Sequence, residues 1–412
     1  MKVRNFRQEV IAGRVRIIAE VVWENRDRPS QDVYLETTAE LETDLYLNPN
    51  SFLLACALPA MRYGEKRIAI DAPICPEIKD GLINAMRCLM NWHAGKRSLI
   101  NIEAPIQSEV LFADKQPRAG AFFSGGIDAL AMLRDNRLNF SQNHPRYIKD
   151  GILVYGILQG ENEADPSFQN VINAVSAMTK DIGINLIQVS TNAYAHFRDL
   201  DPDFSFWRRE YIGSFLAAVA HAFVPRLTIA SIASTYDYAC LEPWGSHPLL
   251  DSLYGNIGLQ IRHENAALSR LEKTKLVGEW DVALKHLRVC NEKASYSRGN
   301  YNCGKCYKCV KTMTALVALG LLDRVDTFIE KDVTKELIVN NCYISDAYGE
   351  HCYLELIEPL SKLERQDLID GIYQISRRYR ERDLRGRIKR FDRNFLGGNL
   401  LNVGEKIKLS LK

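Results

Sequence analysis

Apolar and polar positions alternate in two stretches near the start of the chain, residues 13–25 and 31–40. A period of two predicts half-buried β-strands. Residues 50–71 hold a short apolar stretch, a turn at 62–64 and a further strand, and residues 76–93 have helical spacing, with apolar residues at Ile78, Leu82, Ile83, Met86, Leu89 and Met90. The pattern predicts a small α+β domain over residues 1–116.

A different pattern follows a polar linker at 113–120. Short apolar runs at 121–123, 151–158, 184–190 and 226–234 alternate with helix-length segments that begin at Asp128 or span 166–183 and 209–224. Strands separated by helices imply βαβ units and a parallel sheet, and nearly continuous apolar runs indicate helices on both faces. We predict an α/β domain over residues 117–325 and a helical region over 326–412.

Composition and charge narrow the classes of protein only slightly. The 412 residues carry a formal net charge of +2, which by itself does not indicate a nucleic-acid partner. No apolar run approaches the length of a membrane span, and no signal peptide is visible, so we expect a soluble, cytoplasmic protein. Residues 374–393 are basic, which favours a solvated helix face, with RNA contact as the alternative. A homo-oligomer is left open.

Four of the ten cysteines, Cys290, Cys303, Cys306 and Cys309, lie within 20 positions. Two-residue spacing lets neighbouring thiolates reach one ion at about 2.3 Å from each sulfur. Four sulfurs leave no open position, so the spacing predicts a structural Zn²⁺ site over 290–309 rather than a catalytic one. An iron–sulfur cluster and the absence of metal are the alternatives. We expect the other six cysteines to be small buried side chains.

The segment Ser124–Gly125–Gly126, with Asp128 two residues on, joins the first strand of the α/β series to its helix. Glycines let the backbone approach a ligand closely, and a helix N-terminus attracts anions. This pattern predicts a phosphate-binding loop, with Asp128 capping the helix or holding Mg²⁺. An ordinary turn is the alternative, and the two common nucleotide fingerprints are absent.

A second polar and aromatic group lies in residues 236–253, after the last strand of the series. We expect a substrate pocket in which Trp244 stacks on a flat ring and His247 orients a polar group. The alternative is a rigid loop whose tryptophan fills a core and whose histidine caps a helix. The candidate substrate-binding residues are Glu242, Trp244, Ser246, His247 and Asp251. Among lone histidines, we expect His221 in the core and His93, His196 and His286 on the surface.

Residues 124–129 resemble the SGGxDS signature of the PP-loop ATP pyrophosphatase superfamily of the N type, with a match at Ser124, Gly125, Gly126 and Asp128 and with Ala129 in place of the final serine. The cysteines resemble the zinc site of the 7-cyano-7-deazaguanine synthases in that superfamily. Residues 268–277 resemble the upstream Lys-x-Glu segment of those enzymes, with Arg270 replacing Lys and Glu272 retained. The segment 242–251 is similar to one found in a group of bacterial PP-loop proteins.

The resemblance implies that Phe123, Ser124, Gly125, Gly126 and Asp128 bind ATP. It implies adenylylation of a carboxylate or amide of a small, deazapurine-like substrate, followed by attack of a nitrogen nucleophile, with ATP, Mg²⁺ and Zn²⁺ as cofactors. Asp128, Arg270 and His247 are the candidate catalytic residues. Two alternatives are a tRNA-modifying enzyme, including thiolation through Cys240, and a nucleotide-binding or scaffold module that has lost catalysis through Ala129.

Overall fold

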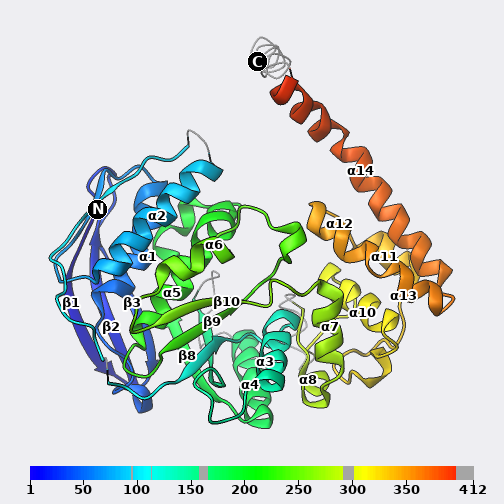
Figure 1. The fold of residues 1–412 in the computed structure, drawn as a ribbon, viewed down its shortest axis with the longest axis horizontal. Helices are drawn as coiled ribbons and strands as arrows, with labels where there is room; N and C mark the ends of the chain where they lie inside the picture. The colour runs from blue at the N-terminus through cyan, green and yellow to red at the C-terminus, as the bar shows by residue number, and fades with distance from the viewer. Residues whose placement is uncertain (94–95, 113, 157–165, 291–300, 396–412) are drawn as a thin grey trace. The chain divides into compact units, whose positions relative to one another are not determined.

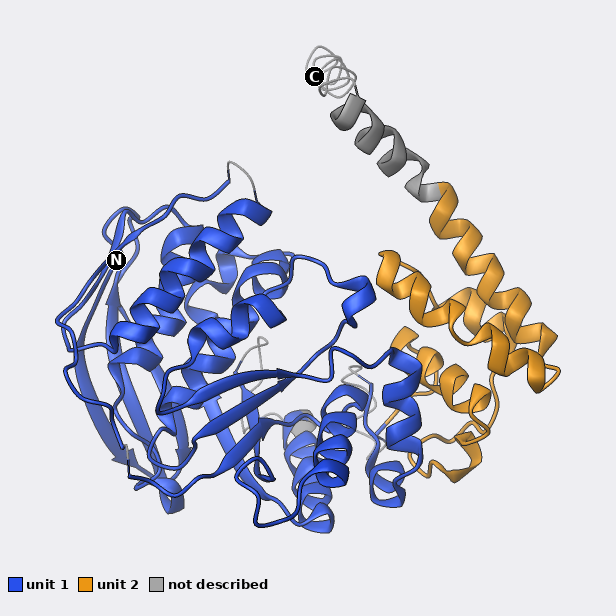
Figure 2. Ribbon diagram, in the orientation of Figure 1, with its two compact units in different colours: residues 1–301 blue, residues 302–412 orange. Residues whose placement is uncertain are grey.

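The structure, a computed structural model, describes residues 1–93, 96–112, 114–156, 166–290 and 301–395 (Figure 1). The chain divides into two compact units, Met1–Tyr301 and Asn302–Lys412 (Figure 2). The boundaries expected from sequence, at 116/117 and 325/326, fall inside these units. The division into three domains therefore stays a prediction.

In the described residues, unit 1 is built on one ten-stranded sheet with the order β10-β9-β6-β7-β8-β3-β2-β1-β4-β5. The strands are β1 (Lys2–Ile11), β2 (Arg14–Val22), β3 (Gln31–Thr38), β4 (Arg67–Ile70), β5 (Asn101–Glu103), β6 (Ala119–Phe122), β7 (Ile148–Tyr155), β8 (Asn185–Thr191), β9 (Ile229–Ala233) and β10 (Gln260–Glu264).

Most neighbouring strands of this sheet are parallel. Strands β6 to β10 pair with one another only in parallel, whereas β1, β2 and β3 form an antiparallel meander. The two parts are joined where β3 pairs antiparallel with β8, with Leu35 opposite Thr191 and Glu36 opposite Ser190. The expected α/β architecture is confirmed at this level, with the N-terminal strands continuing the same sheet.

The helices of unit 1 form two packed groups, which Figure 1 shows on opposite sides of the strands. Helix α1 packs against α2 and α5, and α5 packs against α6; in the other group α3 packs against α7, and α4 and α7 pack against α8. The bounds are α1 (Pro49–Arg62), α2 (Pro76–Trp92), α3 (Ile127–Asn139), α4 (Pro166–Ile182), α5 (Ile212–Ala222), α6 (Pro248–Asp251), α7 (Arg270–Gly278) and α8 (Asp281–His286).

Helix α1 is the apolar stretch that the sequence pattern left without an assignment. It is buried along almost its whole length and contains Pro59 in its interior. Proline has no N–H, so the carbonyl oxygen four residues earlier, that of Ala55, loses its helical donor. The Tyr211 hydroxyl donates to this oxygen at 2.7 Å, and the Ser214 hydroxyl donates to the oxygen of Leu54 at 2.6 Å. The backbone of α1 thus anchors the start of α5.

The buried carboxylate of Asp150, near the start of β7, links the parallel strands to the N-terminal residues through Arg226. Asp150 on β7 is fully buried and accepts two hydrogen bonds from Arg118, at 2.5 and 2.7 Å, and two from Arg226, both at 2.9 Å. Arg226 also donates to Asp44 at 2.7 Å. Because the carboxylate is paired on both oxygens, its charge is balanced inside the protein.

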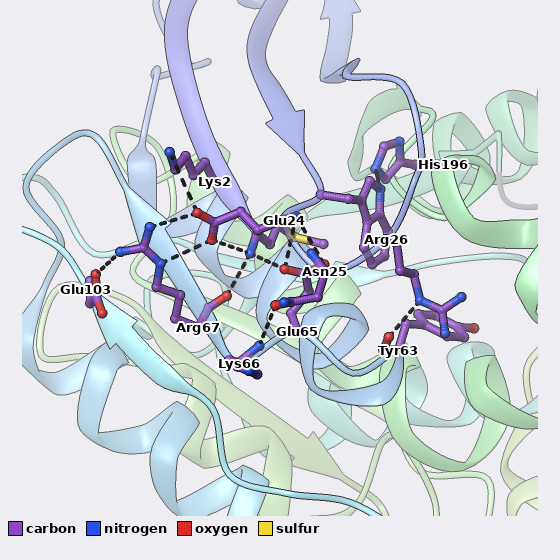
Figure 3. Close-up of polar contacts among 12 residues, drawn as sticks. Lys2, Glu24, Asn25, Arg26, Tyr63, Glu65, Lys66, Arg67, Glu103 and His196 are labelled. Carbon is purple, nitrogen blue, oxygen red and sulfur yellow. Dashed lines mark hydrogen bonds and ion pairs between the residues drawn. The ribbon is translucent and has the colours of Figure 1, made fainter.

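A second charged network lies at the end of the sheet where β1 and β4 begin and β2 ends (Figure 3). Glu65 accepts hydrogen bonds from the backbone N–H groups of Glu24 and Asn25 and from the amino group of Met1. Arg67 donates to Glu24 at 2.7 Å and to Glu103 at 2.6 Å. The hydrogen bond from Arg67 lowers the pKa of Glu24 to about 2.

Unit 2 is helical over its described residues. Helix α10 (Tyr307–Ala318) packs against α11 (Lys335–Asn341) and α13 (Ile357–Lys362), and α14 (Gln366–Phe395) packs against α11, α12 (Ala347–Leu354) and α13. The basic stretch 374–393 lies in α14, and the side chains of 382–395 lie outside the description. None of the described helices has both the length and the apolar character needed to span a bilayer.

The histidine expectations were right for His221 and wrong for two others. His221 is buried in the core, where its Nε2 donates to the oxygen of Tyr254 at 2.8 Å. His196 and His286 are also buried, and His93 is half-buried. His196 accepts from the Trp23 indole N–H at 2.9 Å, and its Nδ1 donates to Gln31. These partners are distant in sequence, so the local pattern carried no sign of this burial.

Buried neutral histidines make the stability of unit 1 depend on pH. Burial lowers the pKa of both His196 and His221 from 6.5 to about 4. Below the unfolded pKa the unfolded state takes up protons that the folded state refuses, so stability is lost as the pH falls from 6.5 towards 4. We expect the free energy of unfolding, measured in urea, to drop by about 2 kcal/mol per histidine between about pH 7 and pH 5. In His196→Gln we expect the drop to be smaller by the contribution of His196. If the pH dependence of the free energy of unfolding is the same as in the wild type, this account is wrong.

Candidate functional site

The candidate site lies where the order of the parallel strands reverses. From β6 the chain adds β7 and β8 on one side of the sheet and then β9 and β10 on the other. Such a reversal leaves a crevice beyond the carboxyl ends of the central strands, where open α/β sheets bind ligands. A cavity of about 300 Å³ lies there, lined by Phe122, Phe123, Ser124, Asp128, Ala129, Ile152, Leu153, Val154, Ile212, Leu216, Ile232, Ala233, Thr235, Trp244 and Ser246.

The backbone of the phosphate-loop candidate has the conformation that the glycines permit. Gly125 has a φ of +76°, and a Cβ there would lie 2.8 Å from Cε of Met178. Gly126 is the N-cap of α3, and no side chain caps that helix. Among the described residues, the backbone N–H groups of Ser124, Gly125 and Gly126 have no acceptor. Unpaired N–H groups at a helix N-terminus can bind an anion.

Arg288 holds the loop through its carbonyl groups, and the sequence pattern gave no sign of this residue. Its guanidinium donates to the carbonyl oxygen of Ser124 at 3.1 Å, and its backbone N–H donates to that of Gly125 at 3.3 Å. With both carbonyl groups engaged, the orientation of the peptide planes is fixed. This role is visible only in the folded structure, because Arg288 and Ser124 are 164 residues apart in the sequence.

The two charged residues expected near the phosphates lie in direct contact. Asp128 is in the first turn of α3, and Arg270 is the first residue of α7, which packs on α3. The Arg270 Nη1 donates to Asp128 Oδ1 at 2.8 Å, and both side chains are partly exposed. Glu272, the other residue of that segment, instead closes a capping box with Ser269 at the start of α7. Its role in the structure is therefore helix capping.

The segment 236–253 contributes only part of its polar residues to the cavity wall. Trp244 and Ser246 line the cavity, and the Trp244 ring packs edge to face on Tyr236, with the centroids 5.4 Å apart. His247 lies behind the wall, where its Nδ1 accepts from the N–H of Leu249 at 3.0 Å and caps α6. Burial lowers the pKa of His247. The capping alternative for this histidine is thus the arrangement observed.

The remaining expected residues of this segment do not line the cavity. Asp251 is fully buried and lies behind Ser246, and Glu242 is half-buried. Cys240, the candidate for sulfur transfer, ends the short helix η4 (Tyr238–Cys240) and is half-buried. Lys273 was missed by the sequence analysis: it is fully buried and donates to the oxygen of Ser234, directly after β9, at 2.9 Å.

Gly245, between the two cavity-lining residues, fixes this wall by backbone contact alone. Its N–H donates to the oxygen of Arg208 at 2.8 Å, and its oxygen accepts from the N–H of Gly213 at 2.9 Å. Arg208 belongs to the π-helical turn η3 (Trp207–Tyr211), and Gly213 lies in the first turn of α5, which follows η3 directly. A Cβ at 245 would lie 2.7 Å from the nitrogen of Tyr211. Only glycine allows the loop to approach this closely.

The four clustered cysteines have the geometry of a metal centre. Their Sγ atoms all lie within 4.8 Å of one another. The Sγ atoms of Cys303 and Cys309 are 3.9 Å apart, close to the edge of about 3.8 Å that a tetrahedron with 2.3 Å zinc–sulfur bonds requires. Cys303 Sγ also accepts from the N–H groups of Lys305, at 3.5 Å, and Cys306, at 3.2 Å.

These contacts fit a bound zinc ion. Backbone N–H groups that point at a sulfur stabilise its thiolate form, which is the form that binds metal. Gly304 allows the bend between Cys303 and Cys306, since its φ is +69° and a Cβ would lie 2.2 Å from an oxygen of Glu330. The ten residues 291–300, inside the expected 290–309 site, lie outside the described part of the chain. The donor set is compatible with structural Zn²⁺.

Comparison with protein-family models, with curated proteins and with solved structures finds no match to this chain. The fold and the sites alone therefore define its class. It is an α/β protein with a mostly parallel sheet, a cavity at the strand-order reversal and a four-cysteine cluster that can hold a metal ion.

Gly245→Ala tests the backbone contact that holds the cavity wall. The added Cβ meets backbone atoms of Glu210 and Tyr211 at 2.7 to 3.0 Å, so the loop has to move. We expect a loss of about 1–3 kcal/mol in the free energy of unfolding, together with weaker binding of any ligand that contacts Trp244. Gly258→Ala is the matched control, because a Cβ there has no neighbour closer than 3.4 Å. Equal effects of the two substitutions contradict the close-approach argument.

Metal analysis tests the four-cysteine site. We expect about one zinc ion per chain by mass spectrometry of the purified protein, with almost none after Cys303→Ser combined with Cys306→Ser. Cys88→Ser is the control, since Cys88 is a half-buried free cysteine outside the cluster. Chelation is expected to lower the thermal midpoint of the wild type but not that of the double variant. A metal-free protein with an unchanged midpoint refutes the site.

Proposed function

We propose that the protein is an ATP-dependent adenylylating enzyme that activates a carboxylate or amide oxygen for attack by a nitrogen nucleophile. The observation that carries this proposal is the cavity itself. It brings together Ser124, from a loop whose N–H groups have no acceptor among the described residues, and an aromatic and polar wall at Trp244 and Ser246. These segments are about 120 residues apart in sequence and meet at the strand-order reversal.

The phosphate end of the cavity offers three kinds of attraction for a polyphosphate. Backbone N–H groups of Ser124, Gly125 and Gly126 can donate to phosphate oxygens, and the exposed Ser124 hydroxyl adds a further donor. Phe123 is buried and directly follows β6, the strand that leads into the loop. Arg270 can turn from Asp128 towards the charge that develops on the leaving pyrophosphate, which frees Asp128 to hold Mg²⁺.

The other end of the cavity suits the acid or amide substrate. Trp244 presents a ring against which a flat substrate, such as a deazapurine, can stack. The substrate oxygen would bond to the α-phosphorus of ATP as the bond to pyrophosphate breaks. A nitrogen nucleophile would then add to the activated carbon, lose a proton and expel AMP with the bonding electrons. His247 has no part in this scheme, because its Nδ1 is committed to the helix cap.

A nucleotide-binding module without catalysis is the second candidate, and Ala129 is the observation that favours it. Its methyl group lines the cavity at the position where the SGGxDS signature carries a hydroxyl. One hydrogen bond to a charged group is thereby absent, which corresponds to about 1.5–3 kcal/mol. The thiolation alternative has less support, because Cys240 does not line the cavity.

ATP–pyrophosphate exchange distinguishes the enzyme from the module. We expect exchange that requires a small carboxylate or amide, and a fall of at least about tenfold after Ser124→Ala or Asp128→Asn, since each removes a contact to charged oxygens. Ala129→Ser is expected to raise the rate. Asp135→Asn, two turns further along α3, is the matched control.

Two results bear against the proposal. Nucleotide binding without exchange, with every acid in the screen, supports the module instead. Exchange that survives both Ser124→Ala and Asp128→Asn means that the phosphates bind elsewhere.

A further inference from the structure

The hydroxyl group of Ser246 is oriented by a buried carboxylate behind the cavity wall. Ser246 lines the cavity, and its Oγ lies 2.7 Å from Oδ2 of Asp251. A carboxylate only accepts hydrogen bonds, so the hydroxyl proton lies on the line to Asp251. The proton of Ser246 is therefore directed into the protein, and the lone pairs of Oγ are left for other partners.

The Asp251 carboxylate stays in place as the acceptor of this proton, because three donors fix its position. Besides Ser246, Nδ1 of His263 donates to Oδ2 at 2.7 Å, and the N–H of His247 donates to Oδ1 at 3.3 Å. The carboxylate is fully buried, and Oδ1 lies 2.3 Å from where a Cβ of Gly213 would be. A rotation of the carboxylate would break all three bonds inside a packed site.

We propose that Ser246 acts in the cavity only as a hydrogen-bond acceptor and thereby selects ligands that present an N–H or O–H donor there. This inference rests on the proposed function for its assignment of the Trp244–Ser246 wall to the activated substrate. The ligand class is a flat ring, stacked on Trp244, with a donor at the edge that faces Ser246. A ring with an acceptor at that edge leaves two facing acceptors without a proton between them, which disfavours its binding.

Three probe compounds of nearly the same shape test this polarity. They are an indole carboxylate, whose ring N–H is a donor, the corresponding benzofuran carboxylate, whose ring oxygen is an acceptor, and the N-methylindole carboxylate, whose donor is blocked. Calorimetry with the full-length protein is expected to show about tenfold tighter binding of the indole than of either analogue. Equal affinities for the three probes, or no binding of any of them, overturn the proposal.

Variants then assign the preference to the Ser246–Asp251 pair. Ser246→Ala is expected to equalise the three affinities. Asp251→Ala removes the acceptor of the Ser246 proton, so the hydroxyl can donate into the cavity and the preference is expected to shift towards the benzofuran. Ser252→Ala, an exposed serine six residues on, should leave the preference unchanged. A preference that survives Ser246→Ala, in a variant with a normal melting temperature, refutes the assignment.

The outcome is separable from that of the proposed function, because the probes are titrated without ATP. If the indole preference is found but acid-dependent exchange is not, the polarity of the wall stands and adenylylation falls. If exchange is found and the preference is not, only the inference about Ser246 falls.

Discussion

The site depends on one constraint, the close approach of the Gly245 backbone to the π-helical turn that precedes α5. Two hydrogen bonds at 2.8 and 2.9 Å hold the glycine where no larger residue fits. Its two neighbours, Trp244 and Ser246, are thereby placed in the cavity wall. π-Helical turns are rare and often occur at functional sites, because the extra residue shifts the groups that follow it. Here the turn supplies backbone partners to the loop and places Ile212 and Leu216 of α5 on the same cavity.

The N-terminal residues support this arrangement from outside the site. Pro59 leaves a carbonyl oxygen of α1 without a helical donor, and Tyr211, the last residue of the π-helical turn, donates to it. The pairing of β3 with β8 and the bond from Arg226, which also holds Asp150, to Asp44 join the N-terminal residues to the parallel strands at other points. None of the described residues among the first hundred lines the cavity, yet α1 fixes the element on which one cavity wall is built.

The sequence predicted features that depend on local pattern and missed those that depend on distant partners. The alternation of strands and helices after residue 117 and the close spacing of three cysteines are local, and both appear in the structure. The contact of Arg270 with Asp128 agrees with the expected grouping of the two residues at the loop. Arg288, His263 and Gly213 had no local signal, because each acts on a residue in another element. The burial of His196 was missed for the same reason, since its partners Trp23 and Gln31 come from the N-terminal strands.

The two ends of the cavity differ in how their hydrogen-bonding groups are committed. At the loop, Arg288 engages the carbonyl groups of Ser124 and Gly125, so the groups left for a ligand are donors. At Ser246 the proton is engaged by Asp251, so the group left for a ligand is an acceptor. In both places a neighbouring residue pairs with one kind of hydrogen-bonding group, acceptors at the loop and a donor at Ser246. The other kind is left for a ligand. An anion is therefore favoured at the first end and a donor-bearing ring at the second, and a ligand that carries both in the opposite order meets mismatched groups at each end.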